Sequence, residues 1–268
     1  MKKISILGCG WLGFPLAKSL LNKGNKVKGS TTSSEKLKDL NAVNIISYEI
    51  ILSENRVKGD IENFLKHSDL LIVNIPPRLR KNPKGNHVAE IENLIPYIEK
   101  SEIKQVIFIS STSVFKDENH FPEIKQDSKP NAISGIAQQL QAVENLLQES
   151  KNFKTSIIRC SGLFDEHRHP GYFLSGRSNI LNPKAPINLI HKNDVISIII
   201  SMIKLNKFPY QFNLSYPYHP SKKLYYTAFC KSKNLPLPKF QETQQSQGKI
   251  IDSEFVERLL NHSWQIKP

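Results

Sequence analysis

The feature that most constrains this chain is the segment GCGWLG at residues 8–13, directly behind the apolar run at 4–7. A short buried strand, a tight turn and a helix form the context in which Gly-x-Gly-x-x-Gly binds a dinucleotide. Gly8 permits the turn, Gly10 lets a pyrophosphate approach the backbone, and Gly13 lets the helix pack closely. The start of that helix offers amide groups and a positive dipole end to the phosphates. We therefore expect a cofactor site at Gly8, Gly10, Trp11, Leu12 and Gly13.

Apolar and amphipathic segments alternate through the first 165 residues. We expect strands at 4–7, 26–29, 45–50, 70–75, 106–110 and 155–160, and helices at about 14–23, from 34, at 61–65, 87–100 and 135–150. Strands separated by helices form right-handed crossovers and a parallel sheet with helices on both faces. The pattern predicts an α/β protein with a doubly wound parallel Rossmann sheet.

The composition changes after residue 165, where His, Pro, Gly and aromatic residues become frequent, as in HRHPGYF and NLSYPYHP. Helical patterns continue at 193–204, 224–232 and 252–260, and the Pro-broken stretch 231–249 is typical of a loop. We expect a dinucleotide-binding domain over 1–165 and a smaller C-terminal α/β substrate lobe over 166–268. Within that lobe, about 187–204 is expected to pack back on the core.

The remaining composition points to a cytoplasmic protein. No apolar stretch of the 268 residues approaches the roughly 20 needed to span a bilayer. The apolar run in the opening MKKISILGCG is too short for an export signal and already belongs to the glycine segment. The three cysteines are widely spaced, so we expect buried free thiols in a reducing compartment.

The formal net charge of +13 raises the question of an anionic partner. Lysines occur along the whole chain, and the densest basic stretch, 78–84, has no interleaved aromatic residue. A nucleic-acid-binding face usually concentrates its charge and accompanies a recognisable motif. We expect a solvated basic surface that attracts small anions and no nucleic-acid partner. Nucleic-acid binding is the less favoured alternative and predicts salt-dependent retention on DNA or RNA.

The residues after the second expected strand bear on which dinucleotide binds. An NAD site usually has Asp or Glu about 20 residues past the glycines, to hold the ribose hydroxyls. Here the segment reads GSTTSSEK over 29–36, with no acid before Glu35. Ser34 is also a candidate helix N-cap. Since hydroxyls and a lysine suit a 2′-phosphate, we expect NADP in preference to NAD, bound by Ser30, Thr31, Thr32 and Lys36.

Four further motifs give the chain a family resemblance: SSTSVF at 110–115, RHPG at 168–171, NLIHKNDV at 188–195 and GKIID at 248–252. With the glycine loop, they resemble YeeZ-type proteins, which are atypical members of the extended short-chain dehydrogenase/reductase group, described as NAD(P)-dependent epimerase/dehydratase-like. The resemblance runs from residue 2 to about 260. It implies a Rossmann core, a C-terminal substrate lobe and, for the wider group, substrates such as nucleotide sugars.

The resemblance also implies catalytic residues, of which only part carries over. Extended members use a Ser or Thr, a Tyr and a Lys as general acid/base machinery beside the nicotinamide. The serine corresponds to Ser111, with Ser113 as a neighbouring substrate-binding candidate. Ser134 stands at the tyrosine position and Gln138 at the lysine position. Because neither can supply an anion near neutral pH, the chemistry needs another acid/base or does not occur.

Replacements are available in the segment 167–177. His169 is a candidate acid/base because histidine titrates near neutrality, although it could equally fix a structural turn before Pro170. Arg168 or Arg177 could clamp a phosphate or carboxylate as a bidentate donor, and Tyr172 is a further substrate-binding candidate.

Several other residues are placed by the same patterns. Ile75 and Pro76, at the end of the fourth expected strand, are expected to form part of the cofactor wall. His191 and Asp194 are expected to tie the late helix to the core, and Lys249 to be exposed unless it reaches the substrate pocket. No ligand spacing supports a metal site.

The sequence therefore predicts an NAD(P)-binding atypical short-chain dehydrogenase/reductase, a reductase or epimerase acting on an anionic sugar- or nucleotide-like substrate. The alternative is a dinucleotide-binding regulator that keeps the fold without the Tyr/Lys pair. Group members often pair through a four-helix interface, so the helices from His87 and Gly135 are candidates for a homodimer contact.

Overall fold

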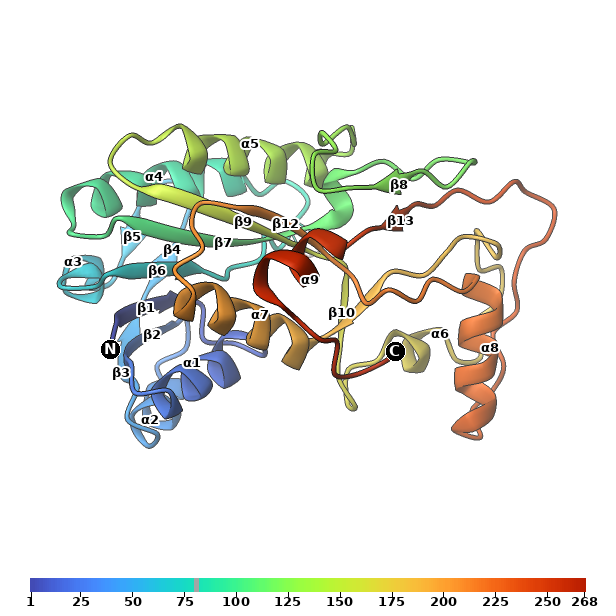
Figure 1. Cartoon of the computed structure of the whole chain (residues 1–268), viewed down its shortest axis with the longest axis horizontal. Helices are drawn as coiled ribbons and strands as arrows, with labels where there is room; N and C mark the ends of the chain where they lie inside the picture. The colour runs from blue at the N-terminus through green and yellow to red at the C-terminus, as the bar shows by residue number, and fades with distance from the viewer. Residues whose placement is uncertain (80–81) are drawn as a thin grey trace. The chain divides into compact units, whose positions relative to one another are not determined.

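The computed structural model describes residues 1–79 and 82–268, and the chain divides into two compact units (Figure 1). Unit 1 comprises 1–111, 134–158 and 199–211, whereas unit 2 comprises 112–133, 159–198 and 212–268. The two units thus alternate along the chain, where the sequence analysis placed a single boundary after residue 165. Arg80 and Lys81 of the basic stretch lie outside the described residues.

A seven-stranded sheet forms the framework. Its order is β12 (Gln211–Leu214), β9 (Lys154–Cys160), β7 (Gln105–Ser111), β6 (Leu70–Val73), β1 (Lys3–Leu7), β2 (Lys26–Thr31), β3 (Ile46–Glu49). The neighbours β1–β2, β1–β6, β2–β3 and β6–β7 pair in parallel. All four residues of β6 are buried, as expected of a central strand whose two faces are covered.

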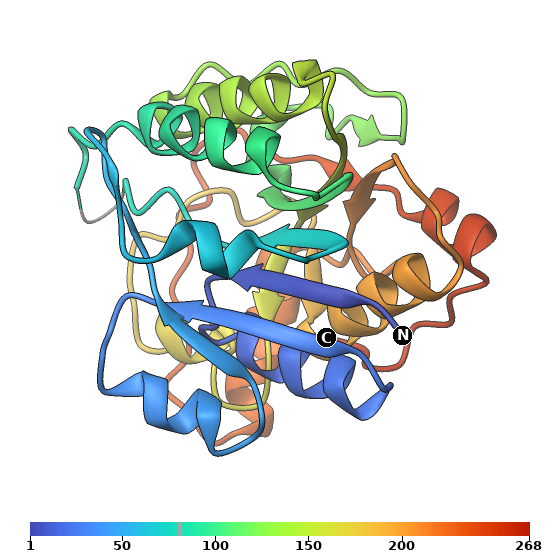
Figure 2. The same cartoon turned by 90° about the vertical axis from the view of Figure 1, so that its left-hand side faces the viewer.

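Helices cover both faces of the sheet in unit 1. Figures 1 and 2 show α4 (His87–Lys100) and α5 (Gly135–Glu149) on one face, and α1 (Gly13–Asn22) and α2 (Lys36–Asn41) on the other. The short α3 (Ile61–Leu65) precedes β6, and β4 (Ile51–Leu52) and β5 (Val57–Lys58) form a hairpin. This arrangement confirms the doubly wound α/β fold.

The elements differ from the sequence prediction in small ways. β12 was missed because four residues with mixed polarity, QFNL, carry little strand signal by themselves. The helix expected from Ser34 begins at Lys36, and its N-cap residue, Glu35, makes no side-chain capping bond. The N-cap role expected for Ser34 is therefore wrong: the chain turns once more before the helix starts.

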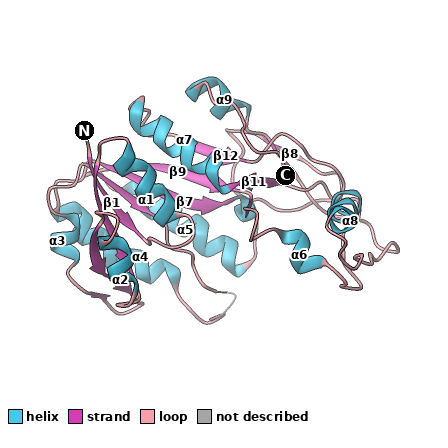
Figure 3. Ribbon diagram, turned by 90° about the horizontal axis from the view of Figure 1, so that it is seen from below, coloured by secondary structure: helices cyan, strands magenta, loops and turns pink. Residues whose placement is uncertain are grey.

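Unit 2 consists of short elements joined by long loops (Figure 3). Its two-stranded sheets are β8 (Glu123–Ile124) with β13 (Ile250–Ile251) and β10 (Gly162–Phe164) with β11 (Leu189–His191). Its helices include α6 (Pro170–Leu174), α8 (Lys222–Ser232) and α9 (Glu254–Leu260), and α7 (Lys192–Lys204) begins in this unit. Its core is rich in aromatic residues and contains Phe164, Ile187, Leu189, Tyr225 and Tyr226.

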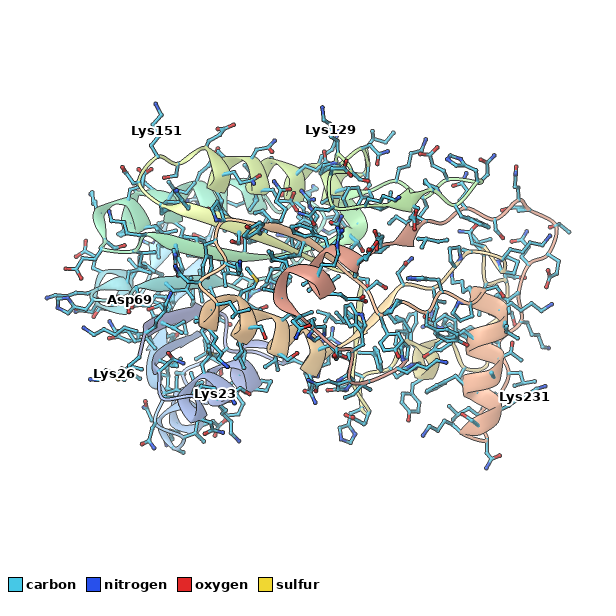
Figure 4. All side chains as sticks on the ribbon, viewed as in Figure 1. Lys23, Lys26, Asp69, Lys129, Lys151 and Lys231 are labelled. Atoms are coloured by element: carbon cyan, nitrogen blue, oxygen red, sulfur yellow. The ribbon has the colours of Figure 1, made fainter. Side chains whose placement is uncertain are left out.

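Lysine side chains extend into solvent from both units. Among the residues labelled in Figure 4, Lys23, Lys26 and Lys151 extend from unit 1, and Lys129 and Lys231 from unit 2. Within the described ranges, no helix combines the length and the apolar character needed to cross a membrane.

Candidate functional site

The glycine loop between β1 and α1 has the geometry that its sequence predicts. Gly8 has a φ of +101°, and a Cβ atom there would lie 2.5 Å from the Asn74 carbonyl oxygen. A Cβ on Gly13 would lie 2.2 Å from the Gly8 carbonyl oxygen, so only glycine lets α1 start this close to the turn. By contrast, among the described residues other than Gly10 and its two chain neighbours, no atom lies within 4 Å of the Cβ position of Gly10. Gly10 therefore leaves its backbone open to an approaching group.

This loop lies at the topological switch point of the sheet. β1 is flanked by β2 and β6, so successive crossovers leave it in opposite directions. In such sheets, ligands bind outside the carboxyl ends of the strands at that point. Asn74, which directly follows β6, donates from Nδ2 to the Gly8 carbonyl oxygen at 2.9 Å. Ile75 has its Cγ2 3.1 Å from the Cβ position of Gly8, and Pro76 is exposed.

The start of α1 differs from that of the other long helices in unit 1. Asn86 and Ser134 cap α4 and α5 with side-chain oxygens, whereas Leu12, the N-cap residue of α1, makes no side-chain capping bond. The Leu12 side chain is buried, and the first turn of α1 contains no acidic residue. An open glycine backbone at an uncapped helix start fits the pyrophosphate of a dinucleotide, which would supply the missing acceptors.

The end of β2 supports the same loop. Ser30 accepts a hydrogen bond from the Gly8 amide through Oγ at 3.0 Å, and its carbonyl oxygen accepts from the Cys9 amide at 2.7 Å. Thr31 Oγ1 accepts from the Ser33 amide at 3.2 Å. Of the four residues expected to bind the 2′-phosphate, Ser30 and Thr31 therefore also hold the local backbone through hydrogen bonds. The side chains of Thr32 and Lys36 are exposed to solvent.

The three cysteines are free and buried, as the sequence predicts. Burial raises the pKa of Cys9 and of Cys160 to about 12, so both remain thiols at neutral pH. Cys9 thus fills space behind the glycine loop without offering a nucleophile.

The serine segment at the end of β7 contains an interaction that the sequence analysis missed. Ser110 donates to the buried carboxylate of Glu144 on α5, with 2.5 Å between Oγ and Oε1. Ser111, the expected substrate-orienting residue, is the last residue of β7 and partly exposed. Ser113 is exposed in the 3₁₀ turn Thr112–Val114. The signal for Glu144 was its helical spacing from the buried Leu140 and Leu147, which places an acid on the core-facing side of α5.

Ser134 has a structural task at the tyrosine position. It is the N-cap of α5, and its Oγ accepts a hydrogen bond from the Ala137 amide at 3.3 Å. Gln138, at the lysine position, is exposed in the first turn. An N-cap hydroxyl is well placed to start a helix, but it supplies no proton acceptor comparable to a tyrosinate.

His169 is enclosed in unit 2 by aromatic side chains. Its ring stacks on Phe229 with 4.0 Å between the ring centroids. Nδ1 accepts from the Gly171 amide at 3.0 Å, so the neutral ring carries its proton on Nε2 and donates it to Tyr225 Oη at 2.9 Å. Burial, aided by the charge of Lys233, lowers the pKa of His169 to about 4. These contacts favour the structural alternative for this residue over an acid/base role at neutral pH.

The other substrate-binding candidates in this segment are exposed. Arg168, Tyr172 and Arg177 all reach the surface, and the Arg177 guanidinium lies 3.4 Å above the Phe173 ring centroid. The buried Asp165 carboxylate shapes the turn before them. It accepts from the Arg168 amide at 2.7 Å and pairs with Lys192 Nζ at 2.5 Å.

The structure agrees with the expectation for Asp194 and differs from the expectation for Lys249. Asp194 is fully buried and accepts hydrogen bonds from the backbone amides of Gln265 and Ile266 at 2.9 and 3.3 Å, which agrees with its expected structural role. Lys249 was expected to be exposed, and this is wrong: it is nine-tenths buried and engaged by two acceptors. In the described part of the chain, no group of three metal-ligating side chains comes together.

Comparisons with known proteins agree with this geometry. A family model described as NAD(P)H-binding matches residues 8–204. Protein YeeZ of Escherichia coli strain K12 is 30% identical to this chain over 268 residues, which cover 99% of this chain and 96% of that protein.

Solved structures of low sequence identity share the fold. A UDP-N-acetylglucosamine 4-epimerase from Bacillus cereus has a TM-score of 0.78 at 16% identity, covering 100% of this chain and 92% of its own. A UDP-glucuronic acid 4-epimerase from Bacillus cereus, in complex with UDP-glucuronic acid and NAD, has a TM-score of 0.78 at 14% identity. That match covers 99% of this chain and 95% of the epimerase chain. The glycine loop, the sheet order and the full-length likeness together show that the chain belongs to the NAD(P)H-binding family and is a YeeZ-like member of it.

Proposed function

We propose that this protein is an NADP(H)-dependent hydride-transfer enzyme, a reductase or an epimerase, acting on an anionic sugar- or nucleotide-like substrate. The observation that carries the cofactor preference is the end of β2. Thr31 closes that strand where an NAD site usually has a carboxylate, and Thr32 and Lys36 beyond it are exposed. A 2′-phosphate finds hydroxyl donors and a cation in this segment, and the nearest acid in sequence, Glu35, follows four residues later.

Each expected residue then has a defined task. The backbone at Gly10 and the start of α1 bind the pyrophosphate, and Ile75 and Pro76 line the cofactor. The bound nicotinamide supplies hydride exchange at C4. Ser111, with Ser113 beside it in sequence, hydrogen-bonds the reacting oxygen of the substrate. The exposed Arg168 and Arg177 bind its phosphate or carboxylate, and Tyr172 contacts its apolar face.

In this proposal the proton that accompanies hydride transfer is exchanged with solvent water at the reacting oxygen, and the general acid/base is not His169. Both of its ring nitrogens are engaged, and its lowered pKa leaves it neutral above about pH 5. Ser134 caps α5 and is assigned no proton transfer. Support for substrates of the nucleotide-sugar class comes from fold relatives such as the 4-epimerase solved with UDP-glucuronic acid and NAD.

The cofactor test is a titration of the protein with NADPH and with NADH, following nicotinamide fluorescence and melting temperature together. We expect NADPH to bind at least about tenfold more tightly and to raise the melting temperature as ln(1 + [L]/Kd). Thr31→Asp places a carboxylate where the 2′-phosphate binds, and we expect it to reverse the preference. Thr31→Asn is the matched neutral control and should keep the preference for NADPH.

A wild-type preference for NADH would contradict the cofactor proposal. It would point to Glu49, which lies opposite Thr31 in the register of β2 and β3. For the reaction, the protein is screened with NADPH against UDP-sugars and small carbonyl acids, and with NADP⁺ against UDP-sugars, because an epimerase first removes hydride from a sugar alcohol. Net consumption of NADPH identifies a reductase, and interconversion of sugars without net consumption identifies an epimerase. Tight NADPH binding without turnover of any of them would contradict the enzymatic part of the proposal.

A further inference from the structure

We infer that Lys249 is a positioning residue for the serine turn, which we define as Thr112–Phe115, directly after Ser111. This inference deepens the proposed function and rests on it, because Ser111 and Ser113 are the substrate-contact serines named there. It concerns unit 2 alone, which contains both Lys249 and the serine turn.

Lys249 binds the C-terminal end of the turn. Its Nζ donates to the Phe115 carbonyl oxygen at 2.7 Å and to Asp117 Oδ1 at 2.8 Å. The preceding carbonyl of the turn, that of Val114, accepts from the amides of Asn131 and Ala132 at 3.1 and 3.0 Å. Two consecutive carbonyls are thus fixed from outside the turn, and the second of them depends on a lysine side chain. We expect these bonds to set the conformation that presents Ser113.

The backbone around Lys249 is itself held on both sides, which fixes where its side chain begins. Gly248 and Glu118 exchange two backbone hydrogen bonds at 2.8 and 3.0 Å. On the opposite edge, the Asn188 side chain donates to the Lys249 carbonyl oxygen at 2.8 Å and accepts from the Ile251 amide at 2.9 Å. The motifs around 188 and 248 therefore meet in one network. This arrangement holds the ammonium group in place rather than leaving it free to sample solvent.

Burial makes the contact strong. The Lys249 side chain is only 10% exposed, so its charge-assisted hydrogen bonds are screened little by solvent. Lys223 provides a contrast, because it pairs with Glu242 at 2.6 Å while 56% exposed. Exposed pairs of that kind contribute little to structure. Loss of the Lys249 ammonium should therefore loosen the serine turn, whereas loss of the Lys223 ammonium should change nothing there.

The test compares Lys249→Met with the full-length wild-type protein by hydrogen–deuterium exchange. We expect amides in the peptide covering 112–118 to exchange about tenfold faster in Lys249→Met, because the opening of the turn no longer breaks a charge-assisted bond. Lys249→Arg keeps a cationic donor and should restore most of the protection. Lys223→Met is the matched control and should exchange like wild type in this peptide. If Lys249→Met does not fold, Asp117→Ala, which removes one exposed partner, should show a smaller increase.

A kinetic measurement distinguishes a lysine that positions the substrate-contact serines from one that only stabilises the turn. With the substrate that the NADPH screen identifies, kcat/KM of Lys249→Met should fall at least about tenfold, while the Kd for NADPH stays within about twofold of wild type. The inference would be overturned if the serine turn of Lys249→Met exchanged at the wild-type rate. It would also be overturned if the turn exchanged faster in this variant while kcat/KM stayed unchanged. Absence of turnover in the wild-type protein would instead count against the proposed function, and the exchange measurement would still decide whether Lys249 holds the turn.

Discussion

At the residue scale, the three glycines of the first loop have different physical roles. Gly8 and Gly13 are required by the chain itself, because a Cβ on either would lie within 2.5 Å of a backbone oxygen. A Cβ on Gly10 would meet nothing within 4 Å among the described residues other than its two chain neighbours. Folding therefore requires glycine at positions 8 and 13, whereas a glycine at position 10 is needed only if a ligand approaches the backbone there.

This difference gives a sharp prediction. Gly10→Ala should fold with a melting temperature near that of wild type, yet weaken NADPH binding at least about tenfold, because its methyl group occupies the path of the pyrophosphate. Gly13→Ala should lose both stability and binding. Thermal unfolding and fluorescence titration check the two variants together, with Gly135→Ala, also in open space, as a stability control. Equal NADPH affinity in Gly10→Ala and wild type would contradict the assignment of the pyrophosphate site.

His169 gives a second prediction at this scale, on pH. Its pKa is about 4 in the folded protein, below the value of 6.5 for a free histidine. Between those two pH values the unfolded chain binds a proton that the folded chain does not, so stability falls as pH falls through this window. The loss should be about 1.4 kcal/mol per pH unit at most. Urea unfolding at pH 4.5, 5.5 and 6.5 should show a shallower pH dependence for His169→Gln than for wild type. Parallel pH profiles would show that His169 titrates normally.

At the scale of elements, the sequence predicted the helices and strands of unit 1 well because their patterns are strong. Buried strands such as LLIV and VIFIS are apolar runs bounded by polar turns. In α4 and α5, the buried apolar residues recur at helical spacing. The candidate site was less predictable. That Lys249 is buried, or that Ser110 meets Glu144, depends on contacts between segments 132 and 34 residues apart along the chain. The helical spacing of Glu144 places this acid on the core-facing side of α5, but a local pattern does not say which distant residue it meets.

The start of α5 supplies the prediction at this scale. Ser134→Ala removes the N-cap and should lower stability by about 1 kcal/mol, or a few degrees in melting temperature. Ser134→Asn keeps a capping oxygen and should restore wild-type stability. Gln138→Ala, in the exposed first turn, should have little effect. If Ser134→Asn were as stable as wild type but abolished turnover, the Ser134 hydroxyl would have a chemical role beyond capping.

At the scale of the whole molecule, the sequence indicated only part of the chain order of the units, through the expectation that about 187–204 packs back on the core. Composition suggested one change of texture near residue 165, but unit 1 also takes residues 199–211. In that segment Ile199 and Met202 are fully buried, Asn206 accepts from Lys2 Nζ at 3.2 Å, and the Tyr210 carbonyl oxygen accepts from the Ile157 amide at 2.9 Å. The segment that joins unit 1 is thus 199–211, which overlaps the expected 187–204 only over residues 199–204.

A fragment of residues 1–165 tests this view. Without 199–211, it loses buried apolar surface and the hydrogen bonds to Lys2 and Ile157, so we expect no cooperative thermal transition and no NADPH binding. Calorimetry and fluorescence titration measure both properties, with the full chain as the reference. A cooperative transition with NADPH affinity close to that of the full chain would show that 1–165 is an autonomous domain.

The alternation of the two units also has a consequence during synthesis. The ribosome delivers the chain from the N-terminus, and unit 1 is complete only when residue 211 has emerged. By then, segments 112–133 and 159–198 of unit 2 have been made, but its final segment, 212–268, has not. Unit 1 can thus complete its fold while the last segment of unit 2 has still to be synthesised. Such a chain exposes apolar surface for much of its translation. We therefore expect the yield of folded protein in the cell to depend more strongly on chaperones than the yield of a protein whose units follow one another along the chain.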